Sequence, residues 1–155
     1  MYNRKLIYES IETRSGKVGY VKIGDHLDSI VMLVGYTGTL FHWNKEFVLL
    51  LAKYYTVYLI DNRFIGLSES INPDTMHGFA LDVRDFIDAK NLKKPYVLGW
   101  SMGGAIVQEL SLIYAHNLSG IILMSTVPNL TKCTNFEFTN LLIKYKSQIS
   151  TMNTH

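Results

Sequence analysis

The sequence is short of cysteine, of long apolar runs and of charge. Its one cysteine, Cys133, rules out an internal disulfide framework and fits a reducing compartment. No stretch approaches the roughly 20 apolar residues of a membrane span, and residues 1–9 lack the apolar core of a signal peptide. We therefore expect a cytoplasmic protein with no membrane span.

Charged residues make up only 18% of the chain, which is below the usual quarter. The 15 Lys and Arg and 13 Asp and Glu leave a net charge of +2, and the only basic doublets are Arg4-Lys5 and Lys93-Lys94. A nucleic-acid footprint needs clustered basic residues, so we expect no nucleic-acid partner. No cluster of metal-ligating residues has zinc-like spacing, and we expect neither a metal nor another cofactor.

The length, the hydrophobic content and the apolar runs of the sequence indicate a globular protein. The length of 155 residues predicts a single domain over residues 1–155, and a hydrophobic content of 48% excludes a largely disordered chain. Four short apolar runs are bounded by turn residues, and they predict strands at residues 30–34, 57–60, 96–98 and 121–124. The runs are continuous rather than alternating, as in parallel strands that are covered on both faces.

Helical patterns lie between these runs. Residues 76–87 place their apolar side chains on one helical face, after a candidate N-cap at Asp74 or Thr75. The charged side chains of this helix fall mostly outside that face: Asp82, Arg84, Asp85 and Asp88. The segment after Ser101 repeats the pattern, and residues 43–55 predict a third helix, apolar nearly all round and so deeply packed.

Strands that alternate with helices imply a sheet built by right-handed crossovers. The fold class that we predict is therefore α/β, a three-layer sandwich with a mostly parallel central sheet. Residues 6–12 and 17–23, separated near Ser15-Gly16, predict an antiparallel hairpin at one edge of that sheet.

The sharpest motif is Gly99-Trp100-Ser101-Met102-Gly103-Gly104, which lies between a predicted strand and a predicted helix. This is the context of a G-x-S-x-G nucleophile elbow. The sharp turn exposes the serine, the glycines leave room for neighbouring backbone, and the helix directs unpaired N–H groups at a developing oxyanion. The alternative interpretation is a glycine-rich turn with a structural serine.

Two further segments each follow a predicted strand. Gly35-Tyr36-Thr37-Gly38 is the candidate for the second half of an oxyanion hole, with the backbone N–H of Tyr36 acting beside that of Met102. The alternative is an ordinary glycine-containing loop. The other segment, residues 61–68, reads Asp61-Asn62-Arg63-Phe64-Ile65-Gly66-Leu67-Ser68.

In this order and at this spacing, the three segments resemble the N-terminal half of an α/β-hydrolase-fold protein, of the esterase, lipase and haloperoxidase-like group. The resemblance covers about residues 20–128. It implies that Ser101 is the nucleophile and that backbone N–H groups of Tyr36 and Met102 form the oxyanion hole. It also implies that residues 61–63 are a structural segment near the pocket.

Two positions depart from the family pattern. The family often has His before the glycine of the oxyanion loop, where this chain has Val34. After the Asp-x-Arg segment the family usually has glycine, where this chain has Phe64. If that position needs a positive φ, phenylalanine costs about 1–2 kcal/mol there.

The acid and the histidine of a catalytic triad follow the serine on this fold. After Ser101 the candidates are Glu109, Glu137, His116 and His155. Glu109 and His116 lie roughly 12 and 22 Å along the helix that leaves the elbow, too far for a hydrogen bond to Ser101. No strand follows Glu137, and His155 is the terminal residue. We interpret the earlier His26, His42 and His77 as surface or packing residues, with His42 nearest to the oxyanion loop.

The resemblance implies a cap and two further strands that carry the acid and the histidine. We therefore expect a fold truncated after about the sixth strand, with residues 134–155 starting a cap region. The strand at residues 121–124 would then be a sheet edge beside an exposed apolar patch. We expect it to meet a complementary C-terminal chain or to drive self-association.

The function predicted from these residues is a serine hydrolase that acts on an ester or similar acyl bond of a small-molecule substrate. Without its acid and histidine, the chain alone should be nearly inactive. Four aromatic residues suggest an apolar acyl pocket: Tyr36, Phe41, Trp43 and Trp100. The alternative is a non-catalytic fragment or interaction module, a truncated pseudoenzyme. The glycine-containing segments match neither the G-x-G-x-x-G dinucleotide-binding motif nor the P-loop, so a nucleotide-binding domain is not expected.

Overall fold

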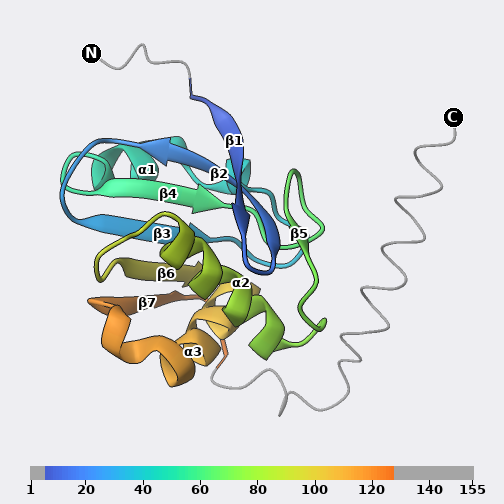
Figure 1. Ribbon diagram of the computed structural model, residues 1–155. Coiled ribbons are helices and arrows are strands. Elements are labelled where there is room, and N and C mark those ends of the chain that lie inside the picture. Colours follow the sequence, from blue (N-terminus) through green and yellow to red (C-terminus); the bar gives the residue numbers. More distant parts are fainter. Residues whose placement is uncertain (1–5, 128–155) are drawn as a thin grey trace, which may run out of the picture.

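The computed structural model describes residues 6–127, and these form one seven-stranded sheet with helices on both faces (Figure 1). In chain order the strands are β1 (Tyr8–Thr13), β2 (Gly16–Ile23), β3 (Ser29–Leu33), β4 (Thr56–Ile60), β5 (Glu69–Ser70), β6 (Tyr96–Trp100) and β7 (Gly120–Met124). The expected hairpin is present as β1 and β2. The two-residue β5 was not expected, because no apolar run marks it.

The sheet is mixed, with the order β1-β2-β4-β3-β6-β7 and with β5 beside β2. β4, β3, β6 and β7 run parallel to one another, whereas β2 is antiparallel to β1, β4 and β5. Leu33 is in register with Ile60 of β4 and with Gly99 of β6. The loops that leave β3, β4 and β6 therefore start at the same edge of the sheet.

The helices complete the three layers. They are α1 (Lys45–Leu51), α2 (Met76–Ala89), α3 (Met102–Tyr114) and the short 3-10 helices η1 (Leu40–His42) and η2 (Ala115–Asn117). Val31 and Leu33 of β3 pack toward α2 and α3, while Ile30 and Met32 pack toward α1. This alternation confirms the three-layer prediction. Every helix within residues 6–127 is too short to cross a membrane.

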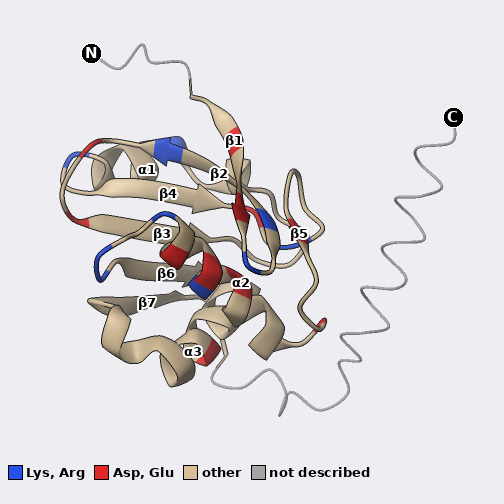
Figure 2. Ribbon diagram, viewed as in Figure 1, with Lys and Arg blue, Asp and Glu red and all other residues tan. Residues whose placement is uncertain are grey.

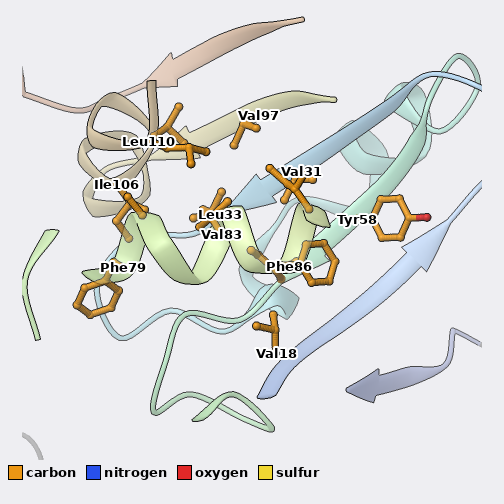
Figure 3. Packing of buried hydrophobic residues seen from close by; sticks show 14 of the residues in the cluster. Val18, Val31, Leu33, Tyr58, Phe79, Val83, Phe86, Val97, Ile106 and Leu110 are labelled. Carbon is orange, nitrogen blue, oxygen red and sulfur yellow. The ribbon is translucent and has the colours of Figure 1, made fainter. Parts of the chain in front are cut away.

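The larger core lies between the sheet and the helices α2 and α3 (Figure 3). Phe79, Val83 and Phe86 of α2 and Ile106 and Leu110 of α3 point into it, and all five are buried. Burying each such side chain stabilises the fold by about 1.5–3 kcal/mol. This core holds α3, and thus the turn at Ser101 from which it starts, against the sheet.

α2 begins as expected but buries one acid that was expected outside its apolar face. Thr75 is the N-cap, and its side chain accepts a hydrogen bond from the Gly78 N–H at 3.0 Å. Asp85 is only 3% exposed. It is buried because the Ser15 hydroxyl and the Arg84 and Arg14 guanidinium groups donate to its carboxylate. Figure 2 shows the charges that gather along α2.

These contacts predict a pH dependence of stability. Burial alone would raise the pKa of Asp85, but hydrogen bonds from Ser15 and Arg84 and the charges of Arg84 and Arg14 lower it below the ordinary 3.8. A carboxyl whose pKa is lowered by folding stabilises the folded state above its unfolded pKa, and that stability is lost as the pH falls. We expect the free energy of unfolding to decrease from about pH 5 to pH 3, and to decrease less in Asp85→Asn.

Urea unfolding at several pH values measures this difference. Ser15→Ala, which removes one donor and keeps the carboxylate, should give an intermediate slope. Identical slopes in the wild type and in Asp85→Asn would contradict the prediction.

α1 corrects the expectation of a long, deeply packed helix at residues 43–55. It spans only Lys45–Leu51, after the Asn44 side chain accepts from the Phe47 N–H at 2.9 Å. Val48 is its only buried residue, and Leu50 is 52% exposed. The apolar pattern overstated the burial because only one face of α1 packs on the sheet.

β7 lies at the end of the sheet, and within residues 6–127 it pairs with β6 alone. Its apolar side chains are 37–42% exposed: Ile121, Ile122, Leu123 and Met124. This is the edge where we expected apolar exposure. The expected cap region at residues 134–155 lies outside the described residues.

Candidate active site

Ser101 lies at a sharp turn between β6 and α3. Its backbone has φ 56° and ψ −119°, a conformation that L-residues rarely adopt and that costs about 1–3 kcal/mol. The Ser101 N–H donates to the Met124 carbonyl at 2.9 Å, and the Ser101 carbonyl accepts from the Gly104 N–H at 3.0 Å. The side chain makes no capping hydrogen bond and is exposed. The turn therefore presents the Ser101 hydroxyl outward.

The glycines of the motif are required by close backbone approach. A Cβ at Gly99 would lie 2.2 Å from the Gly103 carbonyl oxygen, and a Cβ at Gly103 would lie 2.5 Å from the Leu33 carbonyl oxygen. A Cβ at Gly104 would lie 2.5 Å from the Thr126 side chain. Only glycine fits at these positions while β6, α3 and the end of β3 keep their spacing.

The loop that follows β3 lies directly against Ser101. A Cβ at Gly35 would be 3.1 Å from the Ser101 Cβ and 3.4 Å from its Oγ. Tyr36 is the next residue of this loop. Met102 is the first residue of α3, so its N–H belongs to the turn without intrahelical acceptors, at the positive end of the helix dipole. The predicted oxyanion donors thus come from the two segments that flank Ser101.

Asp61 and Asn62 tie this loop to the sheet. The buried Asp61 carboxylate accepts from the Tyr8 hydroxyl at 2.6 Å and from the Leu40 N–H at 2.7 Å. The Asn62 side chain donates to the Val34 carbonyl at 3.2 Å. Burial, and then the hydrogen bond to Asp61, raises the pKa of the Tyr8 hydroxyl to about 12. Tyr8 therefore remains a donor across the neutral pH range.

Arg63, the residue after Asn62, is held by contacts to α2 and to the chain that precedes this helix. Its buried guanidinium pairs with Asp82 at 2.6 Å and donates to the Asn72 and Pro73 carbonyls at 2.6 and 2.8 Å. It also lies 4.4 Å from the centre of the Phe79 ring. Burial raises the pKa of Asp82, while hydrogen bonds from Ser70 and Asn72 and the charge of Arg63 act in the opposite direction. No sequence signal pointed to Asp82 as the partner.

Phe64 has a φ of 63°, so the turn does require the left-handed conformation for which the family pattern has glycine. The Phe64 N–H donates to the Ser68 carbonyl at 3.0 Å, which closes the turn. The turn itself is thus retained, and the strain of a bulky residue at this position is present in the folded chain.

The histidines and acids of residues 6–127 do not complete a triad at Ser101. The Glu109 carboxylate pairs with the His77 Nδ1 at 3.0 Å. The His42 Nδ1 accepts from the Thr39 N–H at 3.0 Å, and the His26 Nε2 lies 3.1 Å from the Ala52 carbonyl. His116 lies in η2, beyond the far end of α3.

No hydrogen bond within the described part of the chain joins the Ser101 hydroxyl to a histidine. Glu137, His155 and Cys133 lie outside the described residues. In the same part of the chain, no group of three His, Cys, Asp or Glu side chains could hold a metal ion.

Aromatic side chains gather beside the elbow. The rings of Trp43 and Trp100 lie 6.2 Å apart, and Trp43 lies 6.2 Å from Phe47. Phe41, also expected in an acyl pocket, packs edge-on against Tyr8 at 5.6 Å and is largely exposed. The structure thus brings the ring of Trp43 beside that of Trp100, the residue that precedes Ser101.

Comparisons with known proteins agree with this geometry. The family model described as "alpha/beta hydrolase fold" matches residues 28–148. A pimeloyl-[acyl-carrier protein] methyl ester esterase of Wigglesworthia glossinidia brevipalpis is 27% identical over 106 residues, 68% of this chain and 39% of the relative. Ethanol acetyltransferase 2 of Hanseniaspora uvarum is 28% identical over 111 residues, 70% of this chain and 32% of the relative.

Solved structures show the same architecture. An alpha/beta hydrolase fold protein from Chitinophaga pinensis has a TM-score of 0.70 and is 30% identical, covering 77% of this chain and 44% of that one. This chain therefore spans less than half the length of the curated relatives and the solved structure that it resembles here.

Proposed function

Because the chain belongs to the alpha/beta hydrolase fold family, we propose that it is a serine hydrolase of ester or similar acyl bonds, with Ser101 as the nucleophile. The observation that carries this proposal is the exposed Ser101 at a φ of 56°, with Gly35 against its side chain. A structural serine needs neither that strain nor that neighbour. The relatives include an esterase, which supports acyl-bond chemistry.

In the proposed reaction, the Ser101 Oγ attacks the carbonyl carbon of a small acyl substrate. The electron pair moves to the carbonyl oxygen, and the backbone N–H groups of Tyr36 and Met102 stabilise the resulting oxyanion. The bond to the leaving alcohol then breaks, and water hydrolyses the acyl-enzyme. A base takes the Ser101 proton and returns it to the leaving alcohol.

That base does not come from residues 6–127 in this proposal. We assign it to a histidine and an acid outside that range, in a complementary chain or another segment. In other hydrolases the oxyanion hole and substrate binding alone leave residual catalysis when the triad is removed. The isolated chain should therefore react slowly with strong electrophiles. A cytoplasmic location stays a prediction that rests on the single cysteine.

Labelling with a fluorophosphonate tests the nucleophile. We expect one adduct per chain by intact-protein mass spectrometry, absent in Ser101→Ala, since the proposal assigns the oxyanion donors Tyr36 and Met102 to this hydroxyl. Ser119→Ala is a matched control, because Ser119 is an exposed serine whose hydroxyl bonds the Lys94 carbonyl. An adduct that persists in Ser101→Ala would contradict the assignment.

A non-catalytic binding module is the second candidate. The observation that favours it is the lack of a histidine contact to Ser101 within residues 6–127. A folded wild-type chain that takes up no adduct would overturn the hydrolase proposal and support this candidate.

A further inference from the structure

The loop between Val34 and Leu40 carries the candidate oxyanion donor, and side chains of one neighbouring segment hold both of its ends. We infer that Asp61 and Asn62 are positioning residues, which fix this loop beside Ser101. This inference rests on the proposed function, because it assigns a role to residues that support the same site.

Asp61 holds the far end of the loop. One oxygen of its carboxylate accepts from the Leu40 N–H at 2.7 Å, and the other accepts from the Tyr8 hydroxyl at 2.6 Å. Asp61 is 3% exposed, and no Lys or Arg within residues 6–127 forms an ion pair with it. Two donors therefore stabilise this buried carboxylate, and one of them is the loop itself.

Asn62 holds the near end. Its side-chain amide donates to the Val34 carbonyl at 3.2 Å, and both residues are buried. A Cβ at Gly103 would lie 2.7 Å from that same carbonyl oxygen. The start of the loop is therefore confined between Asn62 on one side and the first turn of α3 on the other.

Between these two anchors the loop forms a tight turn. The Gly38 N–H donates to the Gly35 carbonyl at 3.2 Å, and Thr37 has a φ of 59°. Gly35 contacts Ser101 from this turn. A displacement of about 1 Å at a reacting group can cost about 100-fold in rate, so the anchors matter for chemistry as well as for folding.

The site requires a carboxylate rather than an amide at residue 61. The Tyr8 hydroxyl accepts from the Leu67 N–H at 2.7 Å, so its one proton goes to Asp61. Asn has a single acceptor oxygen and would point an NH₂ group at either Tyr8 or Leu40. Asp61→Asn therefore reverses or loses one of the two hydrogen bonds and removes the carboxylate charge from both, with almost no change in side-chain volume.

Amide hydrogen exchange and fluorophosphonate labelling together test the inference, in Asp61→Asn and Asn62→Ala. We expect amides of residues 36–40 to exchange about 10-fold faster or more, as local opening is eased, and Ser101 labelling to slow by 10- to 100-fold. Asn62→Ala keeps the test available if Asp61→Asn does not fold.

Ser68→Ala is the matched control. The buried Ser68 hydroxyl donates to the Asp61 carbonyl and accepts from the Gly19 N–H, at 2.8 and 2.9 Å, but it does not contact the loop. We expect this variant to lose stability while exchange at residues 36–40 and labelling stay at wild-type values.

Three results would overturn the inference: unchanged exchange at Leu40, an equal change in Ser68→Ala, or faster exchange with wild-type labelling in a folded variant. If the wild type itself takes up no adduct, the proposed function fails. The exchange rates then decide by themselves whether Asp61 and Asn62 hold the loop.

Discussion

Replacing Gly103 by alanine is expected to slow fluorophosphonate labelling of Ser101 by about 100-fold and to destabilise the fold by about 3 kcal/mol. The new Cβ would lie 2.5 Å from the Leu33 carbonyl oxygen and 2.7 Å from that of Val34. Both atoms are backbone, so neither can rotate away as a side chain would. α3 must then move off the end of β3, and Ser101 moves away from Gly35.

Gly120→Ala is the control for this prediction. A Cβ there would lie 3.3 Å from the Tyr96 ring, which can adjust, so we expect less than about 1 kcal/mol of change and wild-type labelling. Urea unfolding gives the stability, and the labelling rate gives the geometry of the elbow. A wild-type stability and a wild-type labelling rate in Gly103→Ala would contradict the prediction, because they would show that α3 can move away from β3 without cost.

Replacing Arg63 by methionine is expected to destabilise the fold by about 3–5 kcal/mol. The Arg63 side chain is 1% exposed, and its partner Asp82 is 13% exposed. Methionine fills much of the volume, but it leaves the largely covered Asp82 carboxylate and the Asn72 and Pro73 carbonyls without their guanidinium donor. Because whole domains are stable by only about 5–15 kcal/mol, this loss should lower the urea midpoint greatly.

Arg14→Met separates burial from charge. Arg14 also pairs with aspartates of α2, but its side chain is 63% exposed, so we expect a loss of no more than about 1 kcal/mol. The double variant Arg63→Met/Asp82→Leu should recover part of the loss, since it removes the uncompensated carboxylate. Equal losses in Arg63→Met and Arg14→Met would contradict the buried-pair account.

The parallel strands were predictable because a strand that is buried on both faces needs a continuous run of apolar residues. Runs expected at residues 30–34 and 96–98 correspond to Ser29–Leu33 and Tyr96–Trp100. The cap of α2 was equally local, since Thr75 bonds an N–H only three residues away.

Burial of single residues was less predictable than the elements themselves. The helix at Lys45–Leu51 carries a strongly apolar sequence and yet exposes Leu50. Asp85 carries a charge and yet is buried, because Ser15 and Arg14 reach it from a hairpin 70 residues away in the sequence. A local sequence pattern gives the polarity of each side chain. Its exposure depends on the residues that other segments of the chain place around it.

The strand, the turn at Ser101 and the helix after it were determined by the sequence alone, because they are contiguous and their constraints are local. Which loops surround Ser101 was decided by the tertiary structure. The strand order places β3 between β4 and β6, so the loops that leave these parallel strands meet at one edge. Gly35 reaches Ser101 there, and Asp61 and Asn62 reach the ends of that loop. Such contacts join residues that are 20 to 70 positions apart, and only the pairing of strands brings them within hydrogen-bonding distance.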